Sequence, residues 1–141
     1  MSATGRPAEA GTTLIEALVA IAITSLIALV GFPRLQQALL GLAQRQTVAV
    51  VAAHLRQVRA AALWTDQRRA LVITADGRGY AASGTISAVP PGVELSSSGG
   101  GPITFYGDGS TTGGVIWVTA ARHSVPVIVT PVSGAISVGG R

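Results

Sequence analysis

The strongest feature of the hydrophobic pattern is an almost unbroken apolar run near the start of the chain. Residues 12–32 read TTLIEALVAIAITSLIALVGF, and Glu16 is the one charged residue between Leu14 and Val30. A helix of about 20 residues that rises ~1.5 Å per residue spans the ~30 Å hydrocarbon core of a bilayer. The pattern therefore predicts a membrane helix over residues 12–32, preceded by a polar leader at residues 1–11.

Three other interpretations of this run compete with a functional membrane helix. A cleaved signal peptide needs a shorter apolar region, a basic start and a small-x-small site, whereas here Arg6 is offset by Glu9 and no such site follows Val30. A plain anchor gives the carboxylate of Glu16 no role. A buried core helix is disfavoured in so small a chain.

Glu16 is the residue of the run that most needs an explanation. An ionisable group inside a membrane segment costs free energy unless it finds a partner or reaches the interface, so a shallow Glu16 extending to the headgroups is the simple alternative. If the chain were cut after Gly11, Thr12 would carry a new α-amine and Glu16 would be the fifth residue. These two groups would share one helix face. In a staggered array of helices, the carboxylate of one subunit could therefore neutralise the amine of its neighbour.

A second helical pattern follows the apolar run. Apolar residues spaced 3, 4, 3 and 4 apart form one stripe, made of Val48, Val51, Leu55, Val58 and Ala62. This spacing predicts that the helix continues to about Thr65 and packs on the chain's own sheet. Pro33 predicts a kink or local melting near Gly31. Arg56 and Arg59 lie on other faces, and His54 is expected at the boundary of the stripe.

From Ala70 the pattern changes to short strands separated by Gly, Pro and Ser. The predicted strands are Ala70–Ala75, Tyr80–Ala82, Gly92–Ser96, Ile103–Tyr106, Val115–Ala120, Val125–Thr130 and Ala135–Val138. Asp76-Gly77 predicts a hairpin turn between the first two. Pro126 indicates an edge strand or a strand start.

These elements predict an α+β fold in which a long N-terminal helix packs on an antiparallel β-sheet domain, of the small β-sandwich type. The expected divisions after the leader and the membrane helix are a continuation of the helix over residues 33–66 and a β domain over residues 67–141.

Composition narrows the classes of function. Charged residues make up only 11% of the chain, against ~25% in soluble domains, which favours lipid or an assembly as the environment. The ten basic residues, all arginine, exceed six acidic ones for a net charge of +4, and cysteine is absent. The missing cysteines exclude disulfides and thiolate chemistry. An all-arginine basic set is only a weak indication of nucleic-acid binding.

No pattern of catalytic, cofactor-binding or metal-binding residues is found. Asp108-Gly109-Ser110 lacks the repeated acidic ligands of a calcium loop and predicts a turn. The glycines at 77 and 79 and at 99–101 do not introduce a helix, as a dinucleotide-binding loop requires. Ser124 stands beside His123 without an evident acidic partner. We therefore expect neither an enzyme nor a cofactor.

The segment Gly11-Thr12-Thr13-Leu14-Ile15-Glu16 resembles the class III signal of type IV pilins and pseudopilins, in which glycine precedes Phe-Thr-Leu-x-Glu and a long apolar helix. Thr12 stands where the family usually has Phe. The resemblance implies that a prepilin peptidase cleaves between Gly11 and Thr12, that Thr12 is then N-methylated and that Glu16 serves assembly. Pro33, at the twenty-second position after the cut, also fits the family.

Three C-terminal segments resemble the GspH/FimT-type domain: residues 91–95 (PGVEL), 103–110 (ITFYGDGS) and 113–118 (GGVIWV). This resemblance implies a minor pseudopilin of a type II secretion system, anchored by a single span in the bacterial inner membrane with its C-terminal domain in the periplasm. It would join major and minor pseudopilins near the tip of a pseudopilus that an inner-membrane platform assembles. The filament would help to export folded proteins, with which the domain could make contact.

Two further functions remain open at this point. The first is a minor pilin of a type IV pilus or competence system, with DNA as a ligand. Clustered cations are needed for that, and beyond Ala70 the chain has only Arg78, Arg122 and Arg141, so nucleic acid is disfavoured. The second is an anchored periplasmic module that never assembles.

Overall fold

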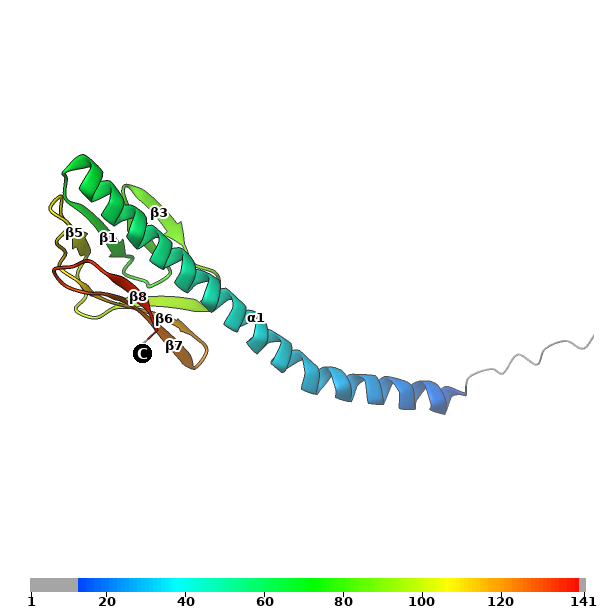
Figure 1. Cartoon of the computed structure of the whole chain (residues 1–141). Helices are drawn as coiled ribbons and strands as arrows, with labels where there is room; N and C mark the ends of the chain where they lie inside the picture. The colour runs from blue at the N-terminus through cyan, green and yellow to red at the C-terminus, as the bar shows by residue number, and fades with distance from the viewer. Residues whose placement is uncertain (1–12, 140–141) are drawn as a thin grey trace, which may run out of the picture. The chain divides into compact units, whose positions relative to one another are not determined.

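The computed structural model describes residues 13–139 of the chain (Figure 1). One helix, α1 (Leu14–Thr65), is followed by eight strands. The chain divides into two compact units, the first ending at Gln36 and the second beginning at Gln37. Each unit is described by itself.

The first unit is a helix whose side chains are all exposed over residues 13–36. Helical structure continues through Pro33, so the local melting expected near Gly31 is wrong. A proline lacks the N–H that would bond to the preceding turn, but it leaves the other helical bonds on either side in place. The kink expected at Pro33 stays a prediction.

The second unit contains the end of α1 and all eight strands. These are β1 (Arg69–Ile73), β2 (Gly79–Ala82), β3 (Thr85–Ala88), β4 (Val93–Ser97), β5 (Ile103–Phe105), β6 (Gly114–Ala120), β7 (His123–Val129) and β8 (Ile136–Val138). They form two four-stranded sheets, in the orders β3-β2-β1-β5 and β4-β6-β7-β8. All pairings are antiparallel. The predicted α+β fold is confirmed.

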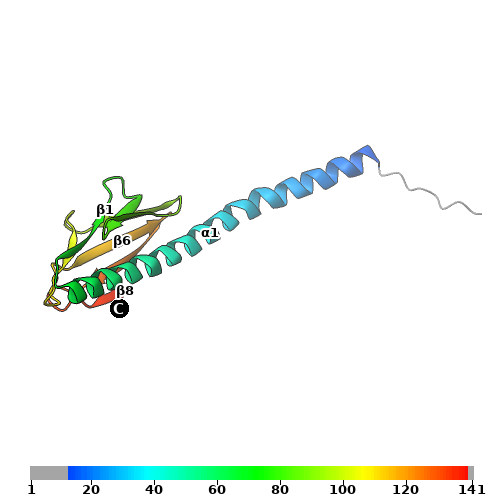
Figure 2. The ribbon, with the colours of Figure 1, turned by 90° about the horizontal axis from the view of Figure 1, so that it is seen from above.

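The core of the second unit combines the helix stripe with both sheets (Figure 2). All five predicted stripe residues, from Val48 to Ala62, are buried. They join one cluster with β-strand residues such as Leu71, Phe105 and Val118. The two sheets of the expected sandwich are present, and α1 completes their core.

Two strand predictions need correction. β3 was not predicted, because it is a four-residue edge strand in which no residue is buried. Pro126 is not on an edge strand, since β7 pairs with both β6 and β8. Its carbonyl accepts a bond from the N–H of Gly139, just beyond the end of β8. The missing N–H of Pro126 therefore points toward a place where the ladder has already ended.

The Asp76-Gly77 turn is confirmed between β1 and β2, and it also connects the two sheets. The N–H of Leu95 in β4 donates to the carbonyl of Gly77 at 2.8 Å. Gly77 has a φ of 67°, and a Cβ there would lie 2.7 Å from the carbonyl oxygen of Leu95. Glycine is needed both for the backbone conformation and for this close approach.

Gln44 is a buried polar residue that holds α1 against the β6–β7 hairpin. Its side-chain amide donates to the carbonyl oxygens of Val118 and His123, each at 2.8 Å. Each such hydrogen bond contributes about 0.5–1.5 kcal/mol to stability. Gln44 therefore fixes the position of the helix along the sheet as well as filling space.

We expect Gln44→Leu to lower the free energy of unfolding by about 1–3 kcal/mol, because it removes two hydrogen bonds that each contribute about 0.5–1.5 kcal/mol. Urea unfolding of the full chain in detergent micelles, followed by tryptophan fluorescence, measures this. Gln46→Leu, the same change at an exposed position, is the control and should have little effect. Equal stability of the two variants would contradict the role given to Gln44.

Candidate functional site

The exposed apolar helix of the first unit is the leading candidate site. An 18-residue window in α1 reaches a mean hydropathy of 2.4, so by length and composition the helix can cross a membrane. Large apolar side chains point outward around it, among them Leu14, Ile15, Ile21, Leu29 and Phe32. A helix that is apolar on all sides needs lipid or other helices around it.

The N-terminus of α1 is capped by Thr13, a feature that the sequence reasoning missed. The N–H of Glu16 donates to the side-chain oxygen Oγ1 of Thr13 at 3.4 Å and to its carbonyl at 3.0 Å. Thr13 thus caps the helix, and Glu16 occupies the third helical position. The Thr-x-x-Glu spacing of a capping box was the available signal. A carboxylate in the first turn also interacts favourably with the helix dipole.

Polar groups inside the apolar run are handled locally. The hydroxyl of Thr24 donates to the carbonyl of Ala20 at 2.8 Å, so it needs no partner outside the helix. Glu16 is different, because an ionised carboxylate cannot be satisfied by its own helix in this way. Gly11 and Thr12, the predicted cleavage and methylation residues, lie outside the described residues, and their roles stay predictions.

Asp108 and Asp76, two acidic residues of the second unit, are turn residues. Asp108 Oδ1 accepts bonds from the N–H of Ser110 at 2.9 Å and from its hydroxyl at 2.6 Å, and the Ser110 hydroxyl lowers the pKa of Asp108. The hydroxyl of Thr74 lowers the pKa of Asp76 in the same manner. Within residues 13–139, no group of three or more His, Cys, Asp or Glu could hold a metal ion.

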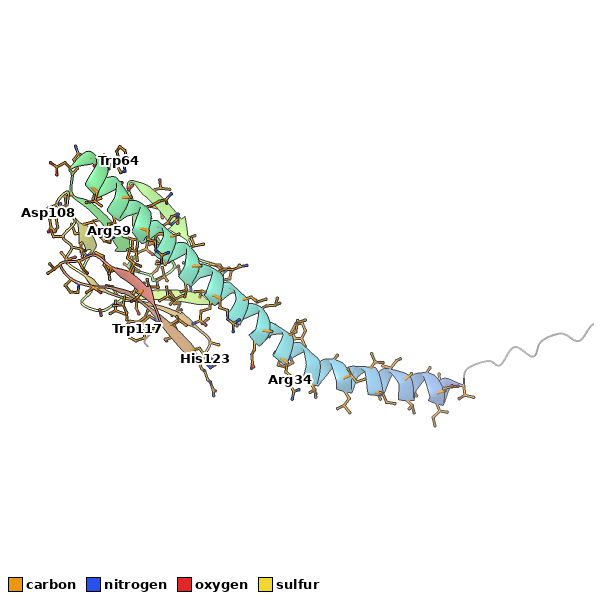
Figure 3. The ribbon with its side chains drawn as sticks, in the orientation of Figure 1. Arg34, Arg59, Trp64, Asp108, Trp117 and His123 are labelled. Carbon is orange, nitrogen blue, oxygen red and sulfur yellow. The ribbon has the colours of Figure 1, made fainter. Side chains whose placement is uncertain are left out.

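The serine and histidine of the β6–β7 hairpin do not form a catalytic pair with an acid. The hydroxyl of Ser124 bonds to that of Thr119 at 2.9 Å. His123 is exposed at the start of β7, beside the turn that holds Arg122 (Figure 3). Ser124 and His123 are therefore surface residues of the β6–β7 hairpin.

One buried histidine–tyrosine contact is present in the second unit. Nδ1 of His54 lies 2.5 Å from the hydroxyl oxygen of Tyr80, with the ring centroids 5.5 Å apart. His54 is half-buried, at the boundary of the stripe as predicted. Burial raises the pKa of the Tyr80 phenol. The contact explains how the core accommodates a tyrosine hydroxyl.

Comparisons with known proteins agree with this division into an apolar helix and a globular unit. Residues 6–32 match the family described as the prokaryotic N-terminal methylation motif. The structure resembles a crystal structure of the type IV minor pilin FimU of Pseudomonas aeruginosa, with a TM-score of 0.55 at 15% identity, covering 68% of this chain and 92% of FimU. A second crystal form gives 0.53 and 15%, covering 74% and 91%. No curated protein matches the chain in sequence.

The chain therefore carries a methylation motif at its N-terminus, and its fold resembles that of a minor pilin. The pilin-like helix and motif together suggest membrane anchoring. At this identity the likeness to FimU shows the fold alone.

The buried Tyr80 phenol makes a test of the second unit possible at high pH. The pilin-like chain has no lysine or cysteine and two tyrosines, Tyr80 and Tyr106. Because burial raises the pKa of Tyr80 in the folded state, its contribution to stability is complete below about pH 10, the pKa of the unfolded phenol, and is lost as the pH rises through the folded-state pKa.

We expect the free energy of unfolding to fall above about pH 10. Tyr80→Phe should remove most of this pH dependence, and Tyr106→Phe, at an exposed position, should retain it. Unfolding in detergent micelles at several pH values, with phenolate absorbance as a second readout, measures both. A pH profile unchanged by Tyr80→Phe would refute the assignment.

Proposed function

We propose that the chain is a minor pseudopilin of a type II secretion system, which assembles into the periplasmic pseudopilus near its tip and supports export of folded proteins across the outer membrane. The observation that carries this is an apolar helix with no side chain buried over residues 13–36, bearing one carboxylate, Glu16, at its first turn. The matched methylation motif and the minor-pilin fold support it.

The physical basis of assembly lies in this helix. In the membrane its side chains contact lipid, and in a filament they contact other helices, so the apolar surface has a partner in both states. Glu16 distinguishes the states, because a charge buried among helices is costly unless it is paired. The α-amine that cleavage would create at Thr12 is a partner of the right sign, supplied by a neighbouring subunit.

In this proposal the other components follow from the same resemblance. A prepilin peptidase cleaves after Gly11 and methylates Thr12, and an inner-membrane platform moves the subunit from the bilayer into the filament. The second unit, from Gln37 onward, lies in the periplasm. It contacts other pseudopilins and the secreted proteins.

A minor pilin of a type IV pilus or competence system is the second candidate, favoured by the fold likeness to FimU. DNA binding remains disfavoured within it. Arg78 follows the β1–β2 turn of one sheet and Arg122 lies in the β6–β7 turn of the other. Arg141 lies outside the described residues.

A deletion strain and its complement distinguish the two systems. Retention of normally secreted proteins in the periplasm, with normal motility and DNA uptake, supports the secretion function. Normal secretion with lost motility or transformation overturns it and assigns the chain to a pilus.

We expect the mature chain to begin at Thr12 with a methylated amine, because cleavage is needed to create the amine that pairs with Glu16. Intact-mass and N-terminal peptide mass spectrometry of the membrane fraction measure this. Gly11→Leu should block processing, and Gly5→Leu, the same change within the leader, should not. An intact Met1, or a cut beyond Val30, would exclude a pilin-type signal.

We expect Glu16→Ala and Glu16→Gln to be cleaved normally but to enter filaments at least tenfold less, since a tenfold change needs only ~1.4 kcal/mol. Quantitative immunoblotting of sheared filaments measures incorporation. Glu16→Gln is the decisive variant, because Gln also fits a capping box but carries no charge. Normal incorporation of Glu16→Gln would refute the role of the charge in assembly.

A further inference from the structure

A groove between α1 and the last strand of the second unit is not used by the proposed filament helix. It has a volume of about 440 Å³. Its lining includes Arg45, Ala49, Ala52 and Arg56 of α1 together with Val125 of β7 and Val138 of β8. We call it the α1–β8 groove. Both views place β8 beside α1 (Figures 1 and 2).

The helix wall of this groove is one face of α1. Its residues are spaced 4, 3, 4 and 3 apart, in the order Arg45, Ala49, Ala52, Arg56 and Arg59. The guanidinium of Arg59 donates to the carbonyl of Ser133 in the β7–β8 loop at 3.1 Å, which directs this face toward β8 (Figure 3). Ala49 and Ala52 have short side chains, which leave space between Arg45 and Arg56.

The strand wall of the groove is an edge with free backbone groups. β8 is the last strand of its sheet. The carbonyl of Ala135 and the N–H of Gly139 bond inward, to Thr130 and Pro126 of the β7 side. Backbone groups alternate in direction along an antiparallel strand. The N–H and C=O groups of Ile136 and Val138 therefore point away from β7, where another strand could bond to them.

The charges of the groove indicate which kind of segment could bind beside β8. Arg45 and Arg56 are exposed, and the lining contains no carboxylate. The side chains between them are apolar. A segment that fits needs carboxylates for the arginines, an apolar side chain between the carboxylates and an extended backbone for the β8 edge.

We propose that the α1–β8 groove binds an acidic, extended segment of a partner protein by adding it to β8 as a further strand. Arg45 and Arg56 are eleven residues apart, which is about 16 Å along a helix. Side chains four residues apart on a strand share one face and are separated by about 13 Å. Arginine side chains are long enough to close the difference, so the segment has the pattern acidic-x-apolar-x-acidic.

The experiment uses the full chain in zwitterionic detergent micelles, labelled with ¹⁵N, and the capped pentapeptide Glu-Thr-Val-Thr-Glu as the probe. Addition of the peptide should shift the amide resonances of Ile136 and Val138 and those of Ala49 and Ala52. The Gln-Thr-Val-Thr-Gln peptide has a similar shape but no negative charges, so it tests whether binding depends on the carboxylates. Equal binding of the two peptides would overturn the proposal, as would the absence of shifts at β8.

Two variants test the two walls separately. Arg45→Glu with Arg56→Glu should weaken binding at least tenfold. Arg68→Glu with Arg122→Glu changes the net charge equally outside the groove and should weaken it less than threefold. Val138→Pro removes one outward N–H and should also weaken binding, with the other amide resonances retained as proof of folding. Unchanged binding by the groove double variant would refute the site. None of these readouts depends on filament assembly, so they stand apart from the secretion proposal.

Discussion

The helix α1 has to satisfy two different environments with one continuous backbone, and the rest of the structure depends on this. Over residues 14–36 no side chain is covered by the chain itself. From Gln44 onward a stripe of the same helix is buried under two sheets. Helical hydrogen bonding makes the first part possible in lipid, where unpaired backbone groups are costly. Side-chain periodicity makes the second part possible in water.

The second unit has to fix the position of its part of α1 along the two sheets. Apolar packing alone would allow the helix to slide by a turn along the sheets with modest loss, because Val, Leu and Ala repeat along the stripe. The amide of Gln44 bonds to two defined carbonyls of the β6–β7 hairpin, which opposes such sliding. Buried, satisfied polar groups are known to specify one arrangement in this way.

The sequence was most informative where periodicity reports burial. The stripe from Val48 to Ala62 and the end of the helix at Thr65 were predicted correctly. β3 could not be found, because it is only four residues long and none of them is buried. Gln44 and Thr47 were missed because they are polar, although each lies four residues before a stripe residue and is buried with it.

For the candidate site, the sequence indicated the apolar helix and Glu16, whereas the cap at Thr13 emerged from the structure. The resemblance to pilins supplied Gly11 and Thr12, which lie outside the described residues. No arrangement of side chains in the second unit could have replaced it, because the two acidic turns and the exposed hairpin carry only local hydrogen bonds.

A place in the first helical turn and the proposed role in assembly are compatible demands on Glu16. A carboxylate at the third helical position interacts favourably with the positive end of the helix dipole. The cost that remains is the cost of burial among other helices. In the proposed assembly, the α-amine of a neighbouring subunit would offset this cost. In this proposal, the same residue supports both a stable monomer in the membrane and the staggered assembly.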